Sequence, residues 1–172
     1  FTTRAIIYLL AWLSKRFTAI VYNSATSKEQ HQAIGYRSAN DLLIPNGFDT
    51  NVFKPYESAS KSRMLCDLSL PDNTFVFGYV SRYHPVKNHI GLMQAFSGVV
   101  EHNSDVRLVL IGQGLCSNNK VLSETIQQLD LSDYVTLLGE RNDIPEILQS
   151  LDAYVSPSHA EAFPNTIGEA MS

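Results

Sequence analysis

The spacing of apolar residues changes repeatedly along the second half of the chain. Four short apolar runs, FVFGYV (75–80), VRLVLI (106–111), YVTLL (134–138) and AYVS (153–156), have the composition of strands buried on both faces. Between them, apolar residues recur three or four positions apart, which predicts helices with one stripe facing a sheet. The stripes are Leu92, Phe96 and Val99; Leu122, Ile126 and Leu129; and Ile144, Ile147, Leu148 and Leu151. This alternation predicts a doubly wound α/β fold around a parallel sheet.

A shorter piece of the same kind precedes it. Residues 18–22 and 42–44 have the pattern of strands, and residues 28–34 that of a helix ended by Gly35. The second strand runs into Pro45-Asn46-Gly47. Residues 49–59 lack periodicity and predict a connector, before a helix near residues 61–68. We therefore place a domain boundary at about residue 50, which gives an incomplete domain over 1–50 and a second domain over 51–172.

One apolar block, AIIYLLAWL (5–13), lies between Arg4 and the pair Lys15-Arg16. It is too short to cross a bilayer, which needs about 20 apolar residues, and no small-residue cleavage site follows it. Two interpretations are open. The preferred one is a buried helix of a globular domain; the other is a basic-flanked helix that touches a membrane surface.

The composition is that of a soluble globular protein, with 44% hydrophobic and 17% charged residues among 172. The net charge of -4 argues against nucleic acid as a partner, because binding its backbone needs an excess of cations. Cys66 and Cys116 lie fifty positions apart with no His or Cys at metal-ligand spacing. This favours buried or inert thiols in a reducing compartment over a disulfide or a metal site.

Ligands of open α/β sheets lie beyond the carboxyl ends of the strands, so the loops that follow each strand are the candidates for chemistry. Arg82 and Lys87 follow the first strand, in a loop that leads to a helix N-terminus. A guanidinium and an ammonium at this spacing could clamp a diphosphate. The alternative is two solvated surface cations.

The second loop contains Gly112-Gln113-Gly114, but Ser117 stands where a dinucleotide fingerprint needs its third glycine. A tight turn is the preferred interpretation. The third loop carries Arg141 in a position that suits contact with a nucleotide base. Asp143 follows it with Glu146 three residues later, which predicts a capping box.

The fourth loop is EAFPNTIGEAM (161–171), in which Glu161 and Glu169 stand eight positions apart. Asn165 is the expected cap of a helix that carries Glu169, while Glu161 lies on the preceding loop. A carboxylate can accept hydrogen bonds from two vicinal hydroxyls, so the pair would suit a ligand with a sugar at one end and a ribose at the other. The alternative is two carboxylates that only favour the helix dipole.

These motifs together resemble the retaining glycosyltransferases of family 4, or group 1, whose GT-B fold has two facing Rossmann-like domains. Glu161 and Glu169 match the family's Glu-x7-Glu motif, and Arg82 and Lys87 match its Gly-Arg-Leu-x3-Lys pattern, here VSRYHPVKNH. IPNGFDTNVFKP (44–55) resembles the passage from the N-terminal domain to the C-terminal one. LVLIGQG, LLGERNDIPEIL and YVSPSHAEAF keep the family's order and spacing.

The resemblance implies roles for these residues. Arg82, Lys87 and Glu161 would be the catalytic residues. Arg82 and Lys87 would bind the diphosphate of a nucleotide-sugar donor, Glu161 would contact the transferred sugar, and Glu169 would contact the ribose. The further donor contacts implied are main-chain groups of Phe163, Pro164, Asn165, Thr166 and Arg141. The commoner motif has glycines at positions 162 and 164, whereas this chain has Ala162 and Pro164. Because proline has no N–H, a donor contact from that amide is excluded, which leaves the donor sugar open.

The implied parent enzyme, of the EC 2.4 class, transfers a sugar from a nucleotide-diphosphate sugar, with UDP as the expected nucleotide, to a glycan or lipid-linked acceptor with retention of configuration. No cofactor or metal is implied, and the sequence has no Asp-x-Asp. A cytoplasmic enzyme of polysaccharide biosynthesis, working at the membrane face, is expected. The chain itself would be an inactive fragment that spans the end of the acceptor-side domain and most of the donor-binding domain.

Two alternatives share this scaffold, a nucleotide-sugar epimerase and a noncatalytic nucleotide-binding module. His84, His89 and His159 also lie near the expected crevice. Each is interpreted as a loop or capping residue and not as a catalyst.

Overall fold

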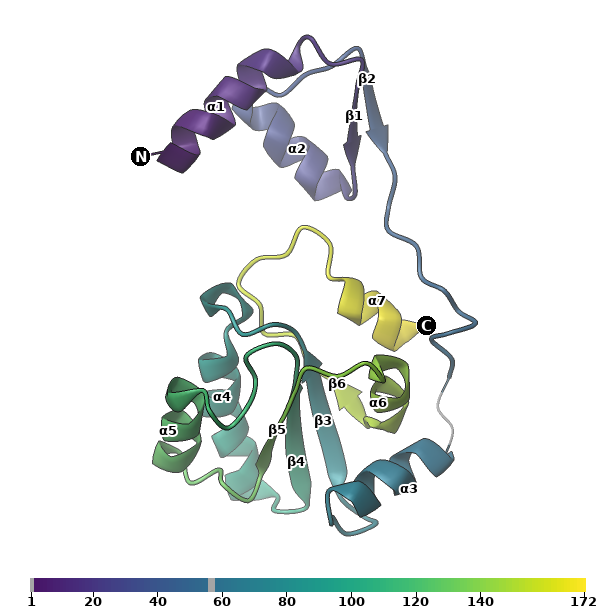
Figure 1. Ribbon diagram of the computed structural model, residues 1–172, viewed down its shortest axis with the longest axis vertical. Coiled ribbons are helices and arrows are strands. Elements are labelled where there is room, and N and C mark those ends of the chain that lie inside the picture. The colour runs from purple at the N-terminus through teal and green to yellow at the C-terminus, as the bar shows by residue number, and fades with distance from the viewer. Residues whose placement is uncertain (1, 56–57) are drawn as a thin grey trace. The chain divides into compact units, whose positions relative to one another are not determined.

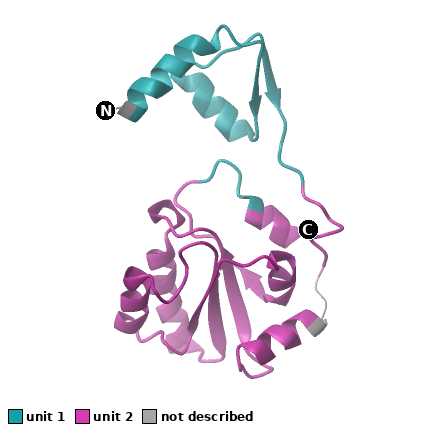
Figure 2. Ribbon diagram, viewed as in Figure 1, with its two compact units in different colours: residues 1–47, 161–165 teal, residues 48–160, 166–172 magenta. Residues whose placement is uncertain are grey.

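The computed structural model describes residues 2–55 and 58–172. Their contacts divide the chain into two compact units, shown in different colours in Figure 2. The first comprises residues 1–47 and 161–165, and the second residues 48–160 and 166–172. Because the placement of the two units relative to each other is not determined, each is described by itself.

The first unit is a small α/β layer. Its elements are α1 (Thr2–Ser14), β1 (Ala19–Tyr22), α2 (Ala25–Ile34) and β2 (Asn40–Leu43). The two strands pair in parallel, with Ala19 opposite Asn40. Ser24 caps α2 by accepting a hydrogen bond from the Ser27 N–H, and the helix ends at Gly35, which has a φ of 104°. The predicted stop at Gly35 is therefore confirmed.

Helix α1 differs from the expected buried helix. Within its described side chains only Ala11 and Ser14 are buried, whereas Tyr8 is 63% and Trp12 58% exposed. Ser14 faces inward because its hydroxyl donates to the Ala11 carbonyl and accepts from the Arg37 N–H. Ala11 and Ser14 thus pack inside the unit and Ile7 and Leu13 are half-buried, whereas the other large apolar side chains of the helix are exposed. The preferred interpretation of this segment as a buried helix is wrong for this structure.

The second unit is a four-stranded parallel sheet with helices on both faces (Figure 1). Its elements are α3 (Ser58–Asp67), β3 (Phe75–Val80), the 3-10 helix η1 (Pro85–Lys87), α4 (His89–His102), β4 (Val106–Ile111), α5 (Lys120–Gln128), β5 (Val135–Gly139), α6 (Ile144–Ser150), β6 (Ala153–Tyr154) and α7 (Asn165–Met171). The strand order is β5-β4-β3-β6, and every pairing is parallel. The predicted doubly wound α/β fold is confirmed.

Strand β4 lies at the centre of the core. Leu108 and Leu110 face the cluster formed with α4 and α5, whereas Val109 and Ile111 face the cluster formed with α3 and α6. All four of these side chains are fully buried, which explains why residues 108–111 are apolar on both faces of the strand. In α4, Phe96 of the expected stripe is buried and Leu92 packs against the core, which confirms these two positions. Val99 is 39% exposed, and Met93 is buried although it was not expected to be.

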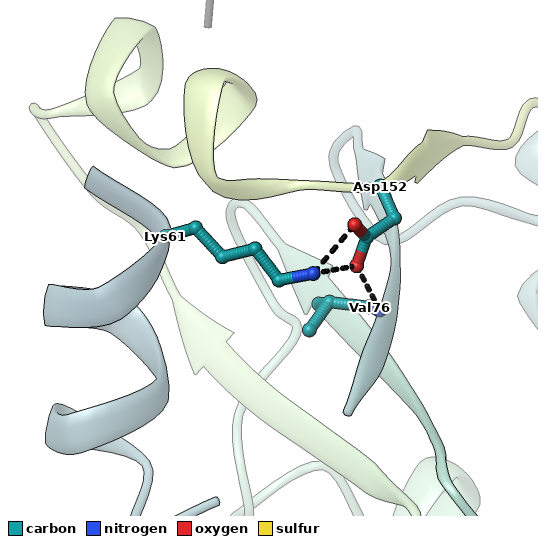
Figure 3. A network of polar contacts seen from close by, with 3 residues as sticks. All are labelled: Lys61, Val76 and Asp152. Carbon is teal, nitrogen blue, oxygen red and sulfur yellow. Dashed lines mark hydrogen bonds and ion pairs between the residues drawn. The ribbon is translucent and has the colours of Figure 1, made fainter. Parts of the chain in front are cut away.

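Asp152 connects the two helices on one side of the sheet with the sheet itself (Figure 3). Its carboxylate accepts a hydrogen bond of 2.8 Å from the N–H of buried Val76 in β3. It also lies 2.5 and 2.7 Å from Nζ of Lys61 on α3. The short loop between α6 and β6 is thereby fixed to both α3 and β3.

We expect Asp152→Ala to lower the free energy of unfolding by about 2 kcal/mol, because it leaves the buried Val76 N–H without an acceptor. Lys61→Ala removes only the partly exposed ion pair and should cost no more than about 1 kcal/mol. Urea denaturation of the two variants measures the difference. Equal losses would show that the ion pair, and not the amide contact, supplies the stabilisation.

Candidate functional site

The loops that follow β3, β4 and β5 are joined by main-chain hydrogen bonds. The Tyr83 N–H donates to the Gln113 carbonyl, the Gly112 N–H to the Gly139 carbonyl, and the Gly139 N–H to the Leu115 carbonyl, each at 2.7 Å. Gly112 and Gly114 both have positive φ, and α5 begins only at Lys120. The Gly-Gln-Gly segment is therefore a turn, as predicted, and the three loops form one continuous edge beyond the carboxyl ends of the strands.

Arg82 and Lys87 lie on the first of these loops. Arg82 is exposed directly after β3, and Lys87 is half-buried at the end of η1. The Nδ1 atom of His84 caps η1 by accepting from the Val86 N–H at 3.3 Å, so the capping role expected for His84 is confirmed. Asn88 then reverses the chain with a φ of 54°, and α4 begins at the next residue. Both cations are thus carried by a loop with a defined backbone path.

The loop after β6 is fixed against the loop after β3. The Tyr79 hydroxyl lies 2.8 Å from Ser158 Oγ and donates to the Lys87 carbonyl at 3.2 Å. The Asn88 side-chain amide donates to the Pro157 carbonyl at 3.3 Å, and the His159 N–H donates to the Val86 carbonyl at 2.8 Å. His159 acts here through its main chain. These contacts hold residues 157–159 beside the segment that carries Lys87.

Thr166 and Glu169 lie on α7. The Tyr154 hydroxyl is 2.5 Å from Thr166 Oγ1 and 3.3 Å from the Val80 carbonyl, and burial raises the pKa of Tyr154 to about 12. The hydroxyl therefore stays protonated at physiological pH and links the helix to the end of β3. Burial also raises the pKa of Glu169. Glu169 lines a cavity of about 240 Å³ together with residues of α6 and of the segment 53–55.

Arg141 and Asp143 pair with each other. The guanidinium donates to both carboxylate oxygens at 2.8 and 2.5 Å, which lowers the pKa of Asp143 and raises that of Arg141. Asp143 precedes α6 but makes no side-chain capping bond. The predicted capping box is therefore wrong, because Arg141 competes for the carboxylate. Arg141 lines a separate cavity of about 460 Å³ between α3 and α6. Neither this cavity nor that of Glu169 includes Arg82 or Lys87.

Glu161, Phe163, Pro164 and Asn165 belong by their contacts to the first unit. Glu161 is exposed, and Phe163 and Pro164 are half-buried. Helix α7 begins at Asn165 itself, so this residue is the first of the helix and not the predicted cap before it. The second unit contains the other expected donor-site residues, Arg82, Lys87, Thr166 and Glu169. A donor site formed by residues of both units therefore stays a prediction.

His89 is a buried residue that the sequence did not distinguish from a loop histidine. It is 2% exposed, and its Nε2 lies 2.9 Å from Ser81 Oγ at the end of β3. Its ring lies 5.2 Å from that of Tyr79 and 5.7 Å from that of Tyr83. Burial, and secondarily the charge of Lys87, lowers the pKa of His89 to about 4. A neutral imidazole therefore packs beneath the loop that carries the two cations.

This burial predicts a pH dependence of stability. The unfolded chain binds a proton at His89 near the ordinary histidine pKa of 6.5, whereas the folded chain binds it only near pH 4. The contribution of neutral His89 to the free energy of unfolding is therefore complete above about pH 6.5. It decreases, by up to about 3 kcal/mol, as the pH falls to about 4. Urea midpoints between pH 4 and 7 should show a smaller loss in His89→Gln than in the parent. His102→Gln, at an exposed position of the same helix, is the control. The same pH slope in all three proteins would contradict this assignment.

Both cysteines are free, with Cys66 exposed and Cys116 half-buried, so of the expected buried or inert thiols the buried form is not observed. Among residues 2–55 and 58–172, no group of three or more His, Cys, Asp or Glu side chains is placed to hold a metal ion. In the same residues no helix is long and apolar enough to cross a membrane.

Comparison with known proteins adds independent information. The model of the family described as "Glycosyl transferases group 1" matches residues 63–172. The chain is 37% identical over 133 residues to the UDP-Gal:alpha-D-GlcNAc-diphosphoundecaprenol alpha-1,3-galactosyltransferase of Escherichia coli, covering 76% of this chain and 34% of that protein. It is 30% identical over 159 residues to the capsular polysaccharide biosynthesis glycosyltransferase CapM of Staphylococcus aureus, covering 88% and 37%.

Among solved structures, Anabaena Alr3699/HepE in complex with UDP-glucose matches with a TM-score of 0.86 and 29% identity. The match covers 99% of this chain and 47% of that one. The chain thus spans about a third of the length of these curated relatives and just under half of the solved structure.

Proposed function

Because this chain belongs to the group 1 glycosyl transferases, we propose that it forms the donor-binding part of a longer enzyme that transfers a sugar from a nucleotide-diphosphate sugar with retention of configuration. The observation that carries the proposal is the loop of Arg82 and Lys87. It is held at the carboxyl edge of the sheet by main-chain bonds to the next loop and by the Tyr79 hydroxyl.

Two cations at this edge suit the chemistry of glycosyl transfer. As the bond between the anomeric carbon and the phosphate oxygen breaks, negative charge increases on the leaving diphosphate. Arg82 and Lys87 stabilise that charge more strongly in the transition state than in the ground state. In this proposal the two side chains, and not a metal ion, neutralise the diphosphate. The leaving phosphate oxygen accepts the proton of the attacking acceptor hydroxyl, and attack on the same face as departure retains the configuration.

The two carboxylates have separate roles in this proposal. Glu169 accepts hydrogen bonds from the ribose hydroxyls, with Thr166 and Tyr154 fixing the start of its helix. Glu161 contacts the hydroxyls of the transferred sugar, and main-chain groups at Phe163, Asn165 and Arg141 complete the donor site. UDP is the proposed nucleotide, which the similarity to a structure in complex with UDP-glucose supports.

We further propose that the acceptor is a glycan or a lipid-linked molecule, and that the enzyme acts in polysaccharide biosynthesis in the cytoplasm. The names of the two relatives support it, since one includes a diphosphoundecaprenol-linked sugar and the other capsular polysaccharide biosynthesis.

The test uses the full-length protein that contains this chain. We expect it to release UDP from a UDP-sugar only when an acceptor is present, and to give a product whose anomeric configuration, read from the ¹H–¹H coupling in NMR, is that of the donor. A sugar epimer formed without acceptor would instead support the epimerase alternative. Binding of a nucleoside diphosphate with neither transfer nor epimerisation would support the noncatalytic nucleotide-binding module.

A further inference from the structure

Helix α7, which carries Glu169, cannot hold its own position. It extends over seven residues, from Asn165 to Met171, and none of them is buried. A helix this short is not stable by itself in water, so contacts with other parts of the chain must fix it. Gly168 lies inside the helix, directly before Glu169, although glycine is a poor helix former. The contacts around Gly168 explain both features.

The aromatic ring of Phe48 lies against the main chain of α7 at Gly168. Phe48 is half-buried, and both residues belong to the second unit. A Cβ on Gly168 would overlap three carbon atoms of the Phe48 ring. The absence of a side chain at this position therefore allows the ring to approach the helix backbone closely.

Tyr154 of β6 contacts α7 from the other side. Its hydroxyl lies 2.5 Å from Thr166 Oγ1. Successive residues of an α-helix are rotated by about 100°, so Thr166 and Gly168, two positions apart, face nearly opposite directions. The helix is therefore held between the Tyr154 hydroxyl and the Phe48 ring.

The side chain of Glu169 borders a cavity. This is the cavity of about 240 Å³ that is also lined by residues of the segment 53–55 and of α6. Close packing does not fix the Glu169 side chain on that side, so the position of its carboxylate depends on the backbone of α7. Because Glu169 follows Gly168 directly, a shift of the helix at the Phe48 contact would also displace the carboxylate.

We propose that Phe48 is a positioning residue of the donor site: its ring holds α7 against Tyr154 and thereby keeps the Glu169 carboxylate in place for the ribose hydroxyls. Phe48 acts through the helix and not by contact with the donor. This inference rests on the proposed function, in which Glu169 binds the ribose. A correctly placed carboxylate distinguishes a ribose from a deoxyribose, because the analogue leaves one of its hydrogen bonds unmade.

The test compares UDP with 2′-deoxy-UDP by calorimetric titration into the full-length protein and its Phe48→Ala variant. The parent should bind UDP at least about tenfold more tightly, because the 2′-hydroxyl donates a charge-assisted hydrogen bond to Glu169. In Phe48→Ala this ratio should fall to about threefold or less, since hydrogen bonds weaken steeply with misplacement. A loss of stability alone would reduce the amount of folded protein but would leave the ratio of the two dissociation constants unchanged.

Two further variants complete the test. Phe48→Leu keeps an apolar side chain at the contact and should give an intermediate ratio. Val52→Ala, at an exposed position of the segment 48–55, should bind both nucleotides as the parent does. A Phe48→Ala protein that keeps the parent's ratio would overturn the inference and leave the proposed function intact. A parent that binds no UDP would contradict the proposed function itself, and equal binding of the two nucleotides by the parent would contradict the ribose contact of Glu169; either result would also overturn the inference.

Discussion

Replacing both Arg82 and Lys87 by alanine in the full-length enzyme is expected to lower kcat/KM for sugar transfer by about 10³-fold or more. The two side chains supply the positive charge proposed to stabilise the leaving diphosphate. Removing a single hydrogen-bond donor of this kind lowers kcat by roughly 10²- to 10³-fold. The losses from two donors that act on one group are not additive. Steady-state kinetics with a UDP-sugar and a saturating acceptor measures the loss.

The control for the single Arg82→Ala variant is Lys120→Ala, which removes one cation at an exposed position of the same unit that lines neither the Glu169 nor the Arg141 cavity. It should keep full activity. Arg82 is exposed, so Arg82→Ala should fold as the parent does and still lose most of the transfer rate. An Arg82→Ala enzyme with unchanged kinetics would show that this side chain is a solvated surface cation, which is the alternative that the sequence left open.

The largest expected loss of stability is at Gly112, in the loop after β4. This residue has a φ of 138°, which side-chain-bearing residues rarely adopt, and a Cβ there would meet the Ser81 carbonyl oxygen at less than contact distance. The Ser81 carbonyl belongs to the main chain, so it cannot avoid the added Cβ by a side-chain rotation. We expect Gly112→Ala to lower the free energy of unfolding by about 3 kcal/mol or more. It should also displace the loop of Arg82, because the Gly112 and Gln113 main-chain bonds join these loops.

Gly98→Ala provides the control for this prediction. Gly98 lies inside α4, and a Cβ there would meet nothing within 4 Å. Alanine is the better helix former, so this variant should be neutral or more stable by up to about 1 kcal/mol. Urea denaturation of both variants measures the contrast. A Gly112→Ala protein as stable as Gly98→Ala would mean that the loop after β4 can move without cost.

The apolar pattern was sufficient to predict the strands of the second unit, because most of β3 and β4 is buried on both faces and their sequences are apolar except for Arg107. The helices followed from their stripes, although α4 buries Met93 where Val99 was expected. The order of the strands in the sheet was not predictable, since it depends on pairings between distant segments that leave no periodic signal.

The candidate site was predictable in its residues more than in its contacts. The loops after the strands were identified from the general placement of ligands in α/β sheets. The bonds that join these loops are made by main-chain groups, which every residue type possesses, so no sequence motif reveals them. Asp143 was assigned to a helix cap because the sequence does not show that Arg141 competes for it. His89 and α1 were misjudged for a related reason, because burial depends on neighbours from other elements.

The central claim, that this chain recognises the diphosphate of a nucleotide-sugar donor, is tested most directly by calorimetric titration of UDP and of UMP into the full-length protein and its Arg82→Ala/Lys87→Ala variant. The second phosphate should improve the affinity of the parent by at least roughly tenfold, as charge-assisted hydrogen bonds do. In the variant, UDP and UMP should bind equally. A preference for UDP that survives the loss of both cations would contradict the account.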